Sequence, residues 1–224
     1  RLLKEKNIKI FNIDKLGYAS NFSMLNEELY LDRYKFLKIN LSNFDNTKTA
    51  IKLIDPDIVF HLAAESHVDK SISGPRQFLE SNVIGTFNLL EALKPHWELL
   101  SSSRKEFFRL IHVSTDEVFG SLGPDGFFSE ESPYNPSSPY SATKAASDHL
   151  VKSWNRTYGI PTIITNSSNN FGAGQFPEKL IPVIIMNALF SKPIPIYGDG
   201  KNIRDWIYVE DHIDALLKVS LNGK

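Results

Sequence analysis

The sequence contains no cysteine, and this absence excludes several kinds of chemistry. Without thiols the chain can form no disulfide framework, no thiolate metal site and no thiol nucleophile. It also has no uninterrupted apolar run close to the roughly 20 residues that a membrane-spanning helix needs. No secretory signal is visible at the start of the sequence. These features fit a cytoplasmic protein, and we expect no membrane partner.

Charge of one sign is not in excess either. The chain has 25 Lys and Arg against 26 Asp and Glu, which gives a formal net charge of −1. Positive and negative residues are interleaved, so we expect no nucleic-acid partner. The hydrophobic content of 42% and the length of 224 residues are those of a globular protein with one large domain, or one domain and part of another.

Short apolar runs alternate with longer helical patterns along the chain. Strands are expected at 8–14, 34–39, 57–64, 108–114 and 161–165, and helices at 45–54, 77–93 and 141–158. This alternation predicts an α/β fold with a parallel sheet that is covered by helices on both faces. The mostly apolar run 57–64 is expected to be buried on both of its faces. From about Asn170 the pattern weakens, and we expect a substrate-covering region to begin there rather than more sheet.

A tyrosine and a lysine share one face of the helix predicted at 141–158. Tyr140 and Lys144 are four residues apart, so both side chains can point into one cleft. A nearby cation favours the phenolate, and we therefore expect the pKa of Tyr140 to be lowered. Such a pair is common by chance. The functional interpretation of this pair is strengthened by its context. The preceding strand places Thr115 at the carboxyl end of the sheet, where open α/β sheets bind ligands. A Thr–Tyr–Lys set of this kind is typical of short-chain dehydrogenases.

Two carboxylates follow that threonine directly. Asp116 and Glu117 are expected where the reacting carbons would lie. An ordinary alcohol dehydrogenase does not need them. A dehydration does, because one carbon loses a proton while a hydroxyl on the next carbon is protonated. Two carboxylates in different environments can have their pKa values pushed apart, which provides one acid and one base.

Two other patterns are interpreted as structural. The glycines of Gly120–Gly126 have the GxxGxxG spacing of a phosphate-binding loop, but Pro124 and the following residues do not open a helix, so we expect an ordinary loop. His61, His67 and His149 form no recognised ligand pair with a carboxylate, and we expect no metal site.

Six segments resemble the nucleotide-sugar 4,6-dehydratases, which are extended short-chain dehydrogenases/reductases. They are His61–Ile72, Val113–Gly120, Pro136–Val151, Thr165–Gly172, Phe176–Pro182 and Pro195–His212. The element VSTDEVFG is similar to the family's STDEVYG, with Phe119 in place of the usual Tyr. The triplet Arg204-Asp205-Trp206 is similar to that of the dTDP-glucose 4,6-dehydratases. A UDP-glucose 4,6-dehydratase, or another nucleotide-sugar epimerase or dehydratase, remains the alternative.

The resemblance implies a Rossmann-like doubly wound parallel sheet that binds NAD. Asp14 would hydrogen bond the adenosine ribose hydroxyls, and its carboxylate would repel a 2′-phosphate, which favours NAD over NADP. The implied cofactor contacts are Asp14, Lys15, Leu16, Gly17, Asn40, Leu41, Leu62, Ala63, Ala64, Glu65, Ser66, Ser81, Tyr140, Lys144 and Asn170. Asn40 stands where the family usually has Asp, and Ser81 where it commonly has Thr.

The resemblance also implies contacts with a nucleotide-sugar substrate, dTDP-glucose. The matching positions are Ser66, Thr115, Asn169, Lys179, Leu180, Pro195, Ile196, Tyr197 and Arg204. Arg204 suits a diphosphate because its planar guanidinium can donate two parallel hydrogen bonds. The stretch Gly172–Lys179 departs from the family pattern, so the loop there is expected to differ in shape.

The implied reaction is an internal redox dehydration. Tyr140, assisted by Lys144, takes a hydroxyl proton from the sugar, Glu117 removes a carbon-bound proton and Asp116 protonates the leaving hydroxyl. A catalytically dead relative would carry a broken Tyr/Lys or Asp/Glu pair, and neither pair is broken here. A homodimer is expected by analogy with the class.

The resemblance covers almost the whole chain but not the whole family pattern. We expect residues 1–169 to form an NAD-binding domain and residues 170–224 to include part of a substrate-binding region. The first strand, glycine-rich loop and helix of the fold are expected to be missing, as is the end of the substrate-binding region. We therefore expect the 224-residue chain alone to bind NAD weakly and to turn over little.

Overall fold

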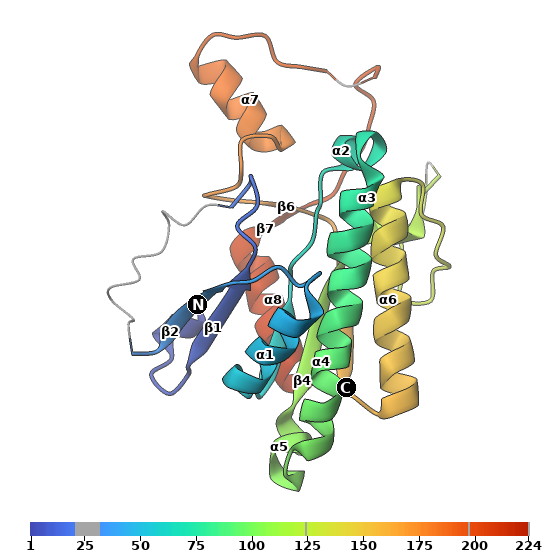
Figure 1. The fold of residues 1–224 in the computed structure, drawn as a ribbon. Coiled ribbons are helices and arrows are strands. Elements are labelled where there is room, and N and C mark those ends of the chain that lie inside the picture. Colours follow the sequence, from blue (N-terminus) through green and yellow to red (C-terminus); the bar gives the residue numbers. More distant parts are fainter. Residues whose placement is uncertain (21–31, 124, 197, 224) are drawn as a thin grey trace.

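The computed structural model describes residues 1–20, 32–123, 125–196 and 198–223, and Figure 1 shows their α/β arrangement. After a short 3₁₀ turn, η1 (Leu2–Lys4), the first half alternates strands and helices. These are β1 (Ile10–Asp14), β2 (Tyr34–Lys38), α1 (Phe44–Ile54), β3 (Ile58–His61), α2 (Val68–Ser73), α3 (Pro75–Phe78), the π-helical turn η3 (Leu79–Ile84), α4 (Gly85–Leu99) and α5 (Ser102–Phe107). The second half contains β4 (Arg109–Thr115), the 3₁₀ turn η4 (Asp116–Phe119), α6 (Pro139–Tyr158), β5 (Thr162–Ser167), β6 (Asn169–Phe171), α7 (Leu180–Leu189), β7 (Trp206–Tyr208) and α8 (Val209–Asn222).

All described strand pairs are parallel, as the alternation of strands and helices predicts. The pairs fall into three separate sheets: β1 with β2, then β3 with β4 and β5, and finally β6 with β7. In the central sheet, Ile58 of β3 is opposite Arg109 of β4, and Leu110 of β4 is opposite Thr162 of β5. The long β4 is therefore the middle strand, and its carboxyl end places Thr115 between its neighbours.

The prediction for the third strand was wrong in two respects. The strand ends at His61 instead of Ala64, and Ile58 is partly exposed rather than buried on both faces. The reason is that β3 lies at the edge of its sheet: among the described residues only β4 pairs with it. Leu62–Ala64 leave the strand and become part of the loop that faces β1 across a cavity.

The helix that carries Tyr140 is well defined at both ends. Pro139 occupies the first turn of α6, where its missing N–H is not needed. Ser138 and Ser141 cap the helix reciprocally, the hydroxyl of each accepting a hydrogen bond from the other's backbone N–H. At the other end Gly159 adopts a positive φ of 70°, which ends the helix after Tyr158. The helix begins two residues earlier than predicted.

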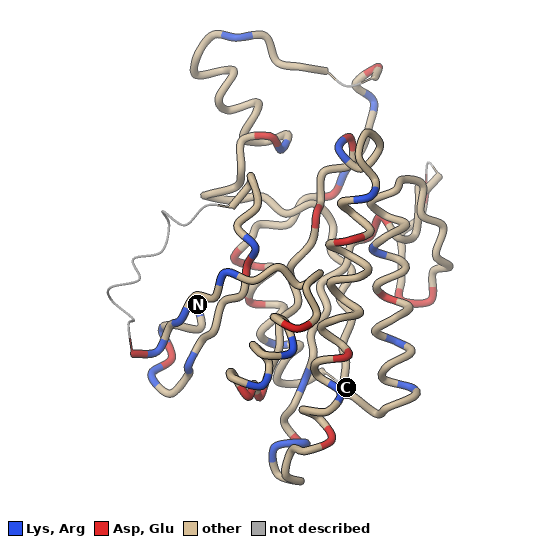
Figure 2. Tube along the Cα trace, in the orientation of Figure 1, with Lys and Arg blue, Asp and Glu red and all other residues tan. Residues whose placement is uncertain are grey.

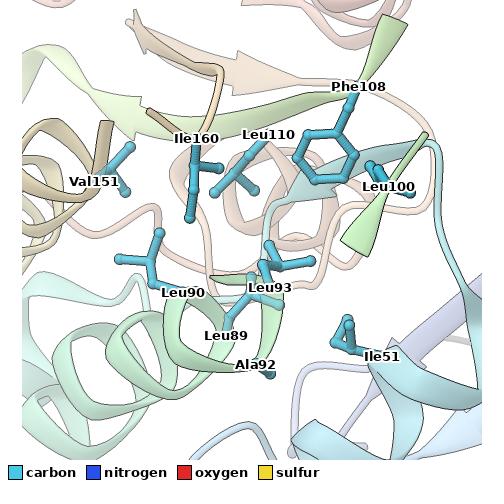
Figure 3. Close-up of a cluster of buried hydrophobic side chains, with 10 residues drawn as sticks. All are labelled: Ile51, Leu89, Leu90, Ala92, Leu93, Leu100, Phe108, Leu110, Val151 and Ile160. Atoms are coloured by element: carbon cyan, nitrogen blue, oxygen red, sulfur yellow. The ribbon is translucent and has the colours of Figure 1, made fainter. Parts of the chain in front are cut away.

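The main hydrophobic core lies between the central sheet and the helices α1, α4 and α6 (Figure 3). Helix α4 contributes three leucines, and Phe108 and Leu110 supply the facing side chains at the start of β4. The ring of Phe108 packs against those of His96 and Trp97, with both ring centroids 5.7 Å away. Helix α6, which carries Tyr140, joins this core through the fully buried Val151.

The C-terminal part contains more regular structure than the weak pattern after Asn170 indicated. A short parallel pair joins Asn169–Phe171 to Trp206–Tyr208, so further sheet does form there. Helix α8 packs back onto β4 and β5, on the face opposite α4 and α6 (Figure 1). Helix α7, by contrast, has no buried residue. It extends away from the sheets, at the top of Figure 1.

Positive and negative residues are interspersed along the described chain (Figure 2). The strongest exposed ion-pair group joins Arg104 of α5 to Asp55 and Asp57, each at 2.7 Å. None of the helices in the described ranges is both long and apolar enough to cross a membrane.

Candidate active site

The turn after β4 brings three of the predicted catalytic residues together. The Thr115 hydroxyl accepts a hydrogen bond from the Glu117 backbone N–H at 3.2 Å and donates one to the Asp116 carboxylate at 3.2 Å. The threonine therefore caps the 3₁₀ turn that carries both carboxylates. Asn166 of the neighbouring strand donates to the Thr115 carbonyl at 3.0 Å, which fixes the end of β4.

Burial raises the pKa of both carboxyls in this turn. At Asp116, the hydrogen bond from Thr115 and the positive charge of Arg204 oppose the effect of burial. At Glu117, the neighbouring Asp116 adds to the effect of burial, while Arg204 and Lys179 oppose it. The two pKa values are thus displaced in the same direction, by burial at both groups and by different neighbours at each. Both groups are closer to proton exchange near neutral pH than ordinary carboxylates.

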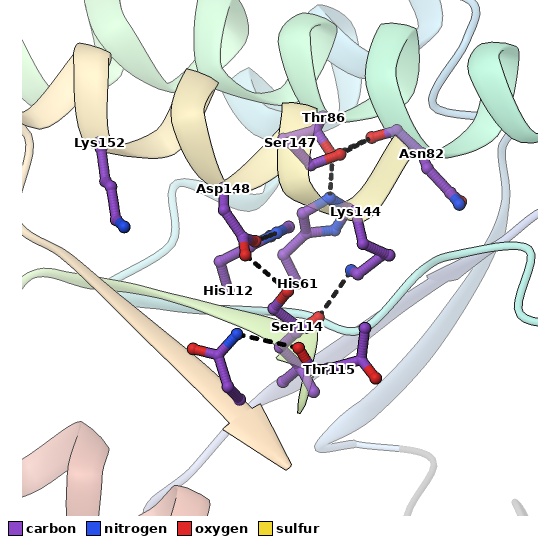
Figure 4. A network of polar contacts seen from close by, with 12 residues as sticks. His61, Asn82, Thr86, His112, Ser114, Thr115, Lys144, Ser147, Asp148 and Lys152 are labelled. Atoms are coloured by element: carbon purple, nitrogen blue, oxygen red, sulfur yellow. Dashed lines mark hydrogen bonds and ion pairs between the residues drawn. The ribbon is translucent and has the colours of Figure 1, made fainter. Parts of the chain in front are cut away.

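Tyr140 and Lys144 lie on the face of α6 that covers β4, and both are buried, at 8% and 4% exposure. The Lys144 ammonium donates a hydrogen bond to the Val113 carbonyl of β4 at 2.8 Å, which anchors the helix to the strand (Figure 4). Burial disfavours its positive charge and lowers the pKa of Lys144 to about 8.

The expectation of a lowered tyrosine pKa was wrong for this structure. Burial, and next the negative charge of Glu117, raise the pKa of Tyr140 well above its usual value. The Thr115 hydroxyl acts in the opposite direction, but it is outweighed. The cation on the helix is thus outweighed by desolvation of the phenol and by the carboxylates of η4. The described groups alone therefore leave Tyr140 as a neutral phenol.

A cavity of about 240 Å³ lies at the carboxyl ends of β1 and β3. Its lining contains nine of the predicted cofactor contacts: Asp14, Lys15, Gly17, Asn40, Leu41, Ala63, Ala64, Glu65 and Ser81. At its rim, the Asp14 carboxylate accepts a hydrogen bond from the Leu16 backbone N–H at 2.6 Å. Across it, Lys15 donates to Glu65 and, at 3.2 Å, to Ser81.

The other six predicted cofactor positions, Tyr140 and Lys144 included, do not line this cavity. Leu16 follows Asp14 with a positive φ of 57°, and Leu62 is more than half exposed. Asn170 of β6 has a buried side-chain oxygen without a hydrogen-bond partner among the described residues. Ser66 is engaged by Lys179, which donates to its carbonyl at 2.9 Å.

The predicted substrate contacts divide into two groups. In the first group, the positive charge of Arg204 lowers the pKa of both Asp116 and Glu117, and that of Lys179 lowers the pKa of Glu117. Leu180 begins α7, next to Lys179, and Asn169 begins β6. Pro195 and Ile196 are exposed in the segment between α7 and β7, away from these groups. Tyr197, like Pro124 of the glycine-containing loop, lies outside the described residues.

An ion-pair cluster, which the sequence did not indicate, closes the edge of this site. Glu178 accepts hydrogen bonds from Tyr18 and Lys70, each at 2.9 Å, and lies 3.8 Å from His67. The Lys70 ammonium also lies over the Tyr18 ring, 3.3 Å from its centroid. These contacts connect the loop after β1, the loop after β3 and the segment before α7.

The model of the GDP-mannose 4,6-dehydratase family matches residues 1–224. The chain belongs to this family. A dTDP-glucose 4,6-dehydratase from Haemophilus influenzae is 53% identical over 216 residues, which are 96% of this chain and 64% of the relative. A probable dTDP-glucose 4,6-dehydratase from Sinorhizobium fredii is 52% identical over 224 residues, which are 100% of this chain and 64% of the relative. The chain thus spans 64% of the length of each of these relatives.

Solved structures show the same fold. A dTDP-glucose 4,6-dehydratase from Bacillus anthracis, in complex with NAD, has a TM-score of 0.85 at 39% identity, covering 100% of this chain and 66% of that one. A UDP-glucuronic acid 4-epimerase from Bacillus cereus, in complex with UDP-glucuronic acid and NAD, reaches 0.84 at 28% identity, covering 100% and 68%. These matches confirm the predicted Rossmann-like fold class. They also show that the fold alone does not separate a dehydratase from an epimerase.

Sequence reasoning missed a buried polar network behind the catalytic pair. Asp148 is one helical turn beyond Lys144 and accepts a hydrogen bond from Ser114, the residue before Thr115 (Figure 4). Asn82 bridges helices by donating to Thr143 at 3.0 Å and to the Glu65 carbonyl at 3.0 Å. Asp148 could have been found from the i, i+4 spacing that identified Tyr140 and Lys144. Asn82 could not, because its partners are distant in sequence.

Proposed function

We propose that the protein of which these 224 residues form a part is an NAD-dependent nucleotide-sugar 4,6-dehydratase that acts on dTDP-glucose. The observation that carries this proposal is the Thr115–Asp116–Glu117 turn, which presents two half-buried carboxyls beside Tyr140 and Lys144. Relatives about 50% identical over nearly the whole chain have the same named activity. The product would be dTDP-4-keto-6-deoxyglucose, which would be used in deoxysugar biosynthesis.

In the proposed reaction, Thr115 positions a sugar hydroxyl and Tyr140 removes its proton. Lys144 supplies the positive charge that a phenolate form of Tyr140 requires. Glu117 then removes the carbon-bound proton next to the new ketone. Asp116, whose pKa is raised by burial, protonates the departing hydroxyl so that water leaves. The two carboxyls thus perform the steps that distinguish a dehydration from a simple oxidation.

The cavity at the ends of β1 and β3 fits NAD chemically. Asp14 presents a carboxylate at a strand end, where ribose hydroxyls would be bound and a 2′-phosphate would be repelled. Lys15 and Ser81 provide donors beside it, and Ala63 and Ala64 provide an apolar wall. When bound, NAD would accept a hydride from the sugar and return it to the sugar, so that no NAD is consumed overall.

The substrate would extend toward α7. Lys179 and Arg204, whose positive charges act on the catalytic turn, are suited to a diphosphate, and Asn169 and Ser66 to the sugar. We further propose a cytoplasmic homodimer, by analogy with the class. Sedimentation of the complete protein in the ultracentrifuge tests the dimer, which a single monomeric species would exclude.

The activity is tested with the complete open reading frame around these residues. The enzyme is incubated with NAD and either dTDP-glucose or UDP-glucose, and the 4-keto product is measured. We expect turnover of dTDP-glucose in preference to UDP-glucose. The 224-residue chain, assayed in parallel, is expected to turn over little because it spans only part of its relatives' length. A preference for UDP-glucose, or formation of an epimer without dehydration, would refute the assignment.

The roles of the carboxyls are tested with Asp116→Asn. This variant should lose about 10²- to 10⁴-fold in water loss, the usual contribution of a general acid. It should still reduce NAD in a single turnover, because the first step does not use this group. Asp125→Asn, in the exposed loop beyond η4, is the matched control and should behave as wild type. A failure of Asp116→Asn to form NADH at all would contradict the assignment.

A further inference from the structure

A fully buried carboxylate lies behind the catalytic lysine. Asp148 is 0% exposed and follows Lys144 by one turn on the same face of α6. One of its oxygens accepts hydrogen bonds from the Ser114 hydroxyl at 2.7 Å and from the Tyr134 hydroxyl at 3.0 Å. These contacts hold the carboxylate between α6, β4 and the loop that precedes α6. Figure 4 shows it next to Ser114 and on the same side of the helix as Lys144.

The second oxygen of Asp148 faces a histidine that supplies little positive charge. It lies 3.1 Å from Nε2 of His112 on β4, and neither atom has a well-directed hydrogen bond. Burial lowers the pKa of His112, although Asp148 opposes this effect. His61 on β3, with its ring centroid 5.1 Å from that of His112, donates to or accepts from Thr86, and burial lowers its pKa well below the usual value. Burial therefore disfavours the charged form of both rings.

Lys144 is the remaining cation in this cluster. It is almost completely buried, and its one hydrogen bond among the described residues goes to the neutral carbonyl of Val113. A buried ammonium without a counter-charge loses its proton. Glu117, Asp116 and Asp148 all raise the pKa of Tyr140, and Asp148 is also the carboxylate that raises the pKa of Lys144 against the effect of burial.

We propose that Asp148 is a positioning residue whose carboxylate keeps Lys144 protonated in its hydrogen bond to Val113. The consequence for catalysis rests on the proposed function: Tyr140 can act as a base only while the neighbouring lysine carries its positive charge. Asp148 itself lies beneath the helix and touches neither the cavity nor the catalytic turn. Its Ser114 and Tyr134 partners fix the position of the carboxylate, and its charge sets the protonation of Lys144.

The proposal is tested first without any activity. The 224-residue chain is labelled with ¹³C at lysine Cε, Lys144 is assigned with a Lys144→Arg variant, and its titration is followed by NMR. We expect a midpoint above pH 7 in wild type and a midpoint lower by about one pH unit or more in Asp148→Asn. Ser114→Ala and Tyr134→Phe each remove one hydrogen bond and keep the charge, so their midpoints should stay close to wild type.

Three results would overturn the proposal. One is an unchanged Lys144 midpoint in a folded Asp148→Asn protein. Another is a Lys144 midpoint below pH 7 in the wild-type chain. This measurement needs no variant, so it tests the proposal even if Asp148→Asn does not fold. An equal fall in Ser114→Ala and Tyr134→Phe would also contradict it, since hydrogen bonding rather than charge would then be responsible.

A second experiment uses the complete enzyme. In Asp148→Asn, the alkaline limb of the kcat profile should move to lower pH, so that the variant is less active than wild type at pH 8 but comparable to it at pH 6. Asp148→Glu, which keeps the charge, should restore the wild-type profile. A loss of kcat that is equal at all pH values would indicate a structural role only and would count against the proposal. If the enzyme proves not to be a dehydratase, the NMR titration still decides the role of Asp148.

Discussion

The buried charge of Lys144 should make the stability of the chain rise with pH in alkaline solution. Burial lowers the pKa of this lysine from its usual 10.5 to about 8. In the unfolded chain the group is solvated and regains its usual value. Between these two pH values the unfolded state therefore binds more protons, and the free energy of unfolding increases with pH. Each pH unit is worth about 1.4 kcal/mol, so the total gain is roughly 3 kcal/mol.

The assay is urea unfolding of the wild-type chain and a Lys144→Met variant from pH 7 to pH 10.5. Methionine has a similar length but no charge, so the variant removes the titrating ammonium at every pH. Only the pH dependence of the difference between the two proteins is therefore diagnostic, because all other titrating groups cancel. We expect wild type to gain roughly 3 kcal/mol relative to Lys144→Met between pH 8 and pH 10.5. A difference that stays flat across this range would refute the reasoning.

Three further predictions concern stability. Phe108→Ala should cost about 3–5 kcal/mol in urea unfolding because the ring is fully buried, whereas Phe107→Ala, 68% exposed, should stay within about 0.5 kcal/mol. Gly120→Ala should cost about 1–3 kcal/mol, since φ is 90° and a Cβ would lie 2.6 Å from the Asn135 carbonyl, and Gly123→Ala, with open space around it, should be neutral. Burial would raise the pKa of Glu178, but the hydrogen bonds from Lys70 and Tyr18 outweigh burial and lower the pKa. The Glu178 carboxylate therefore stabilises the fold at neutral pH, and this stabilisation is lost as pH falls through the lowered pKa. Glu178→Gln should therefore lower the Tm at pH 7, and the difference from wild type should disappear in acid; a constant difference would contradict it.

The alternation of strands and helices was sufficient to predict the fold class and the order of the main elements. The spacing of apolar residues and the capping of helices are local properties of the sequence. The predicted limits of α1, α6 and β4 therefore lie close to those in the structure. Which strand is an edge strand is not local. The run 57–64 is apolar enough for a central strand, yet β3 has one described neighbour and ends at His61. The β6–β7 pair was missed for the same reason, because each strand has only three residues and their pairing spans more than thirty positions.

The candidate site was predictable where residues are close in sequence or match a known motif. The Thr115–Glu117 turn and the Tyr140–Lys144 pair are contiguous or one helical turn apart, and nine of the cofactor positions do line one cavity. The electrostatics were not predictable. Whether a cation lowers the pKa of Tyr140 depends on how deeply the phenol is buried and on which carboxylates face it, and both depend on tertiary packing.

This limit also indicates what a bound cofactor and substrate must change. Without them, burial leaves Tyr140 neutral, Lys144 close to losing its proton, and both carboxyls of η4 with raised pKa values. Each of these four groups is thus displaced toward its uncharged form, as expected for ionisable side chains in an incompletely solvated cleft. A positive charge supplied near Tyr140 by a bound cofactor would favour the phenolate, and would so assist Tyr140 in removing the hydroxyl proton as the sugar is oxidised. The counter-charge of Asp148 is what prevents Lys144 from becoming neutral in the meantime, and this is why a residue that touches no substrate would govern the pH range of the reaction.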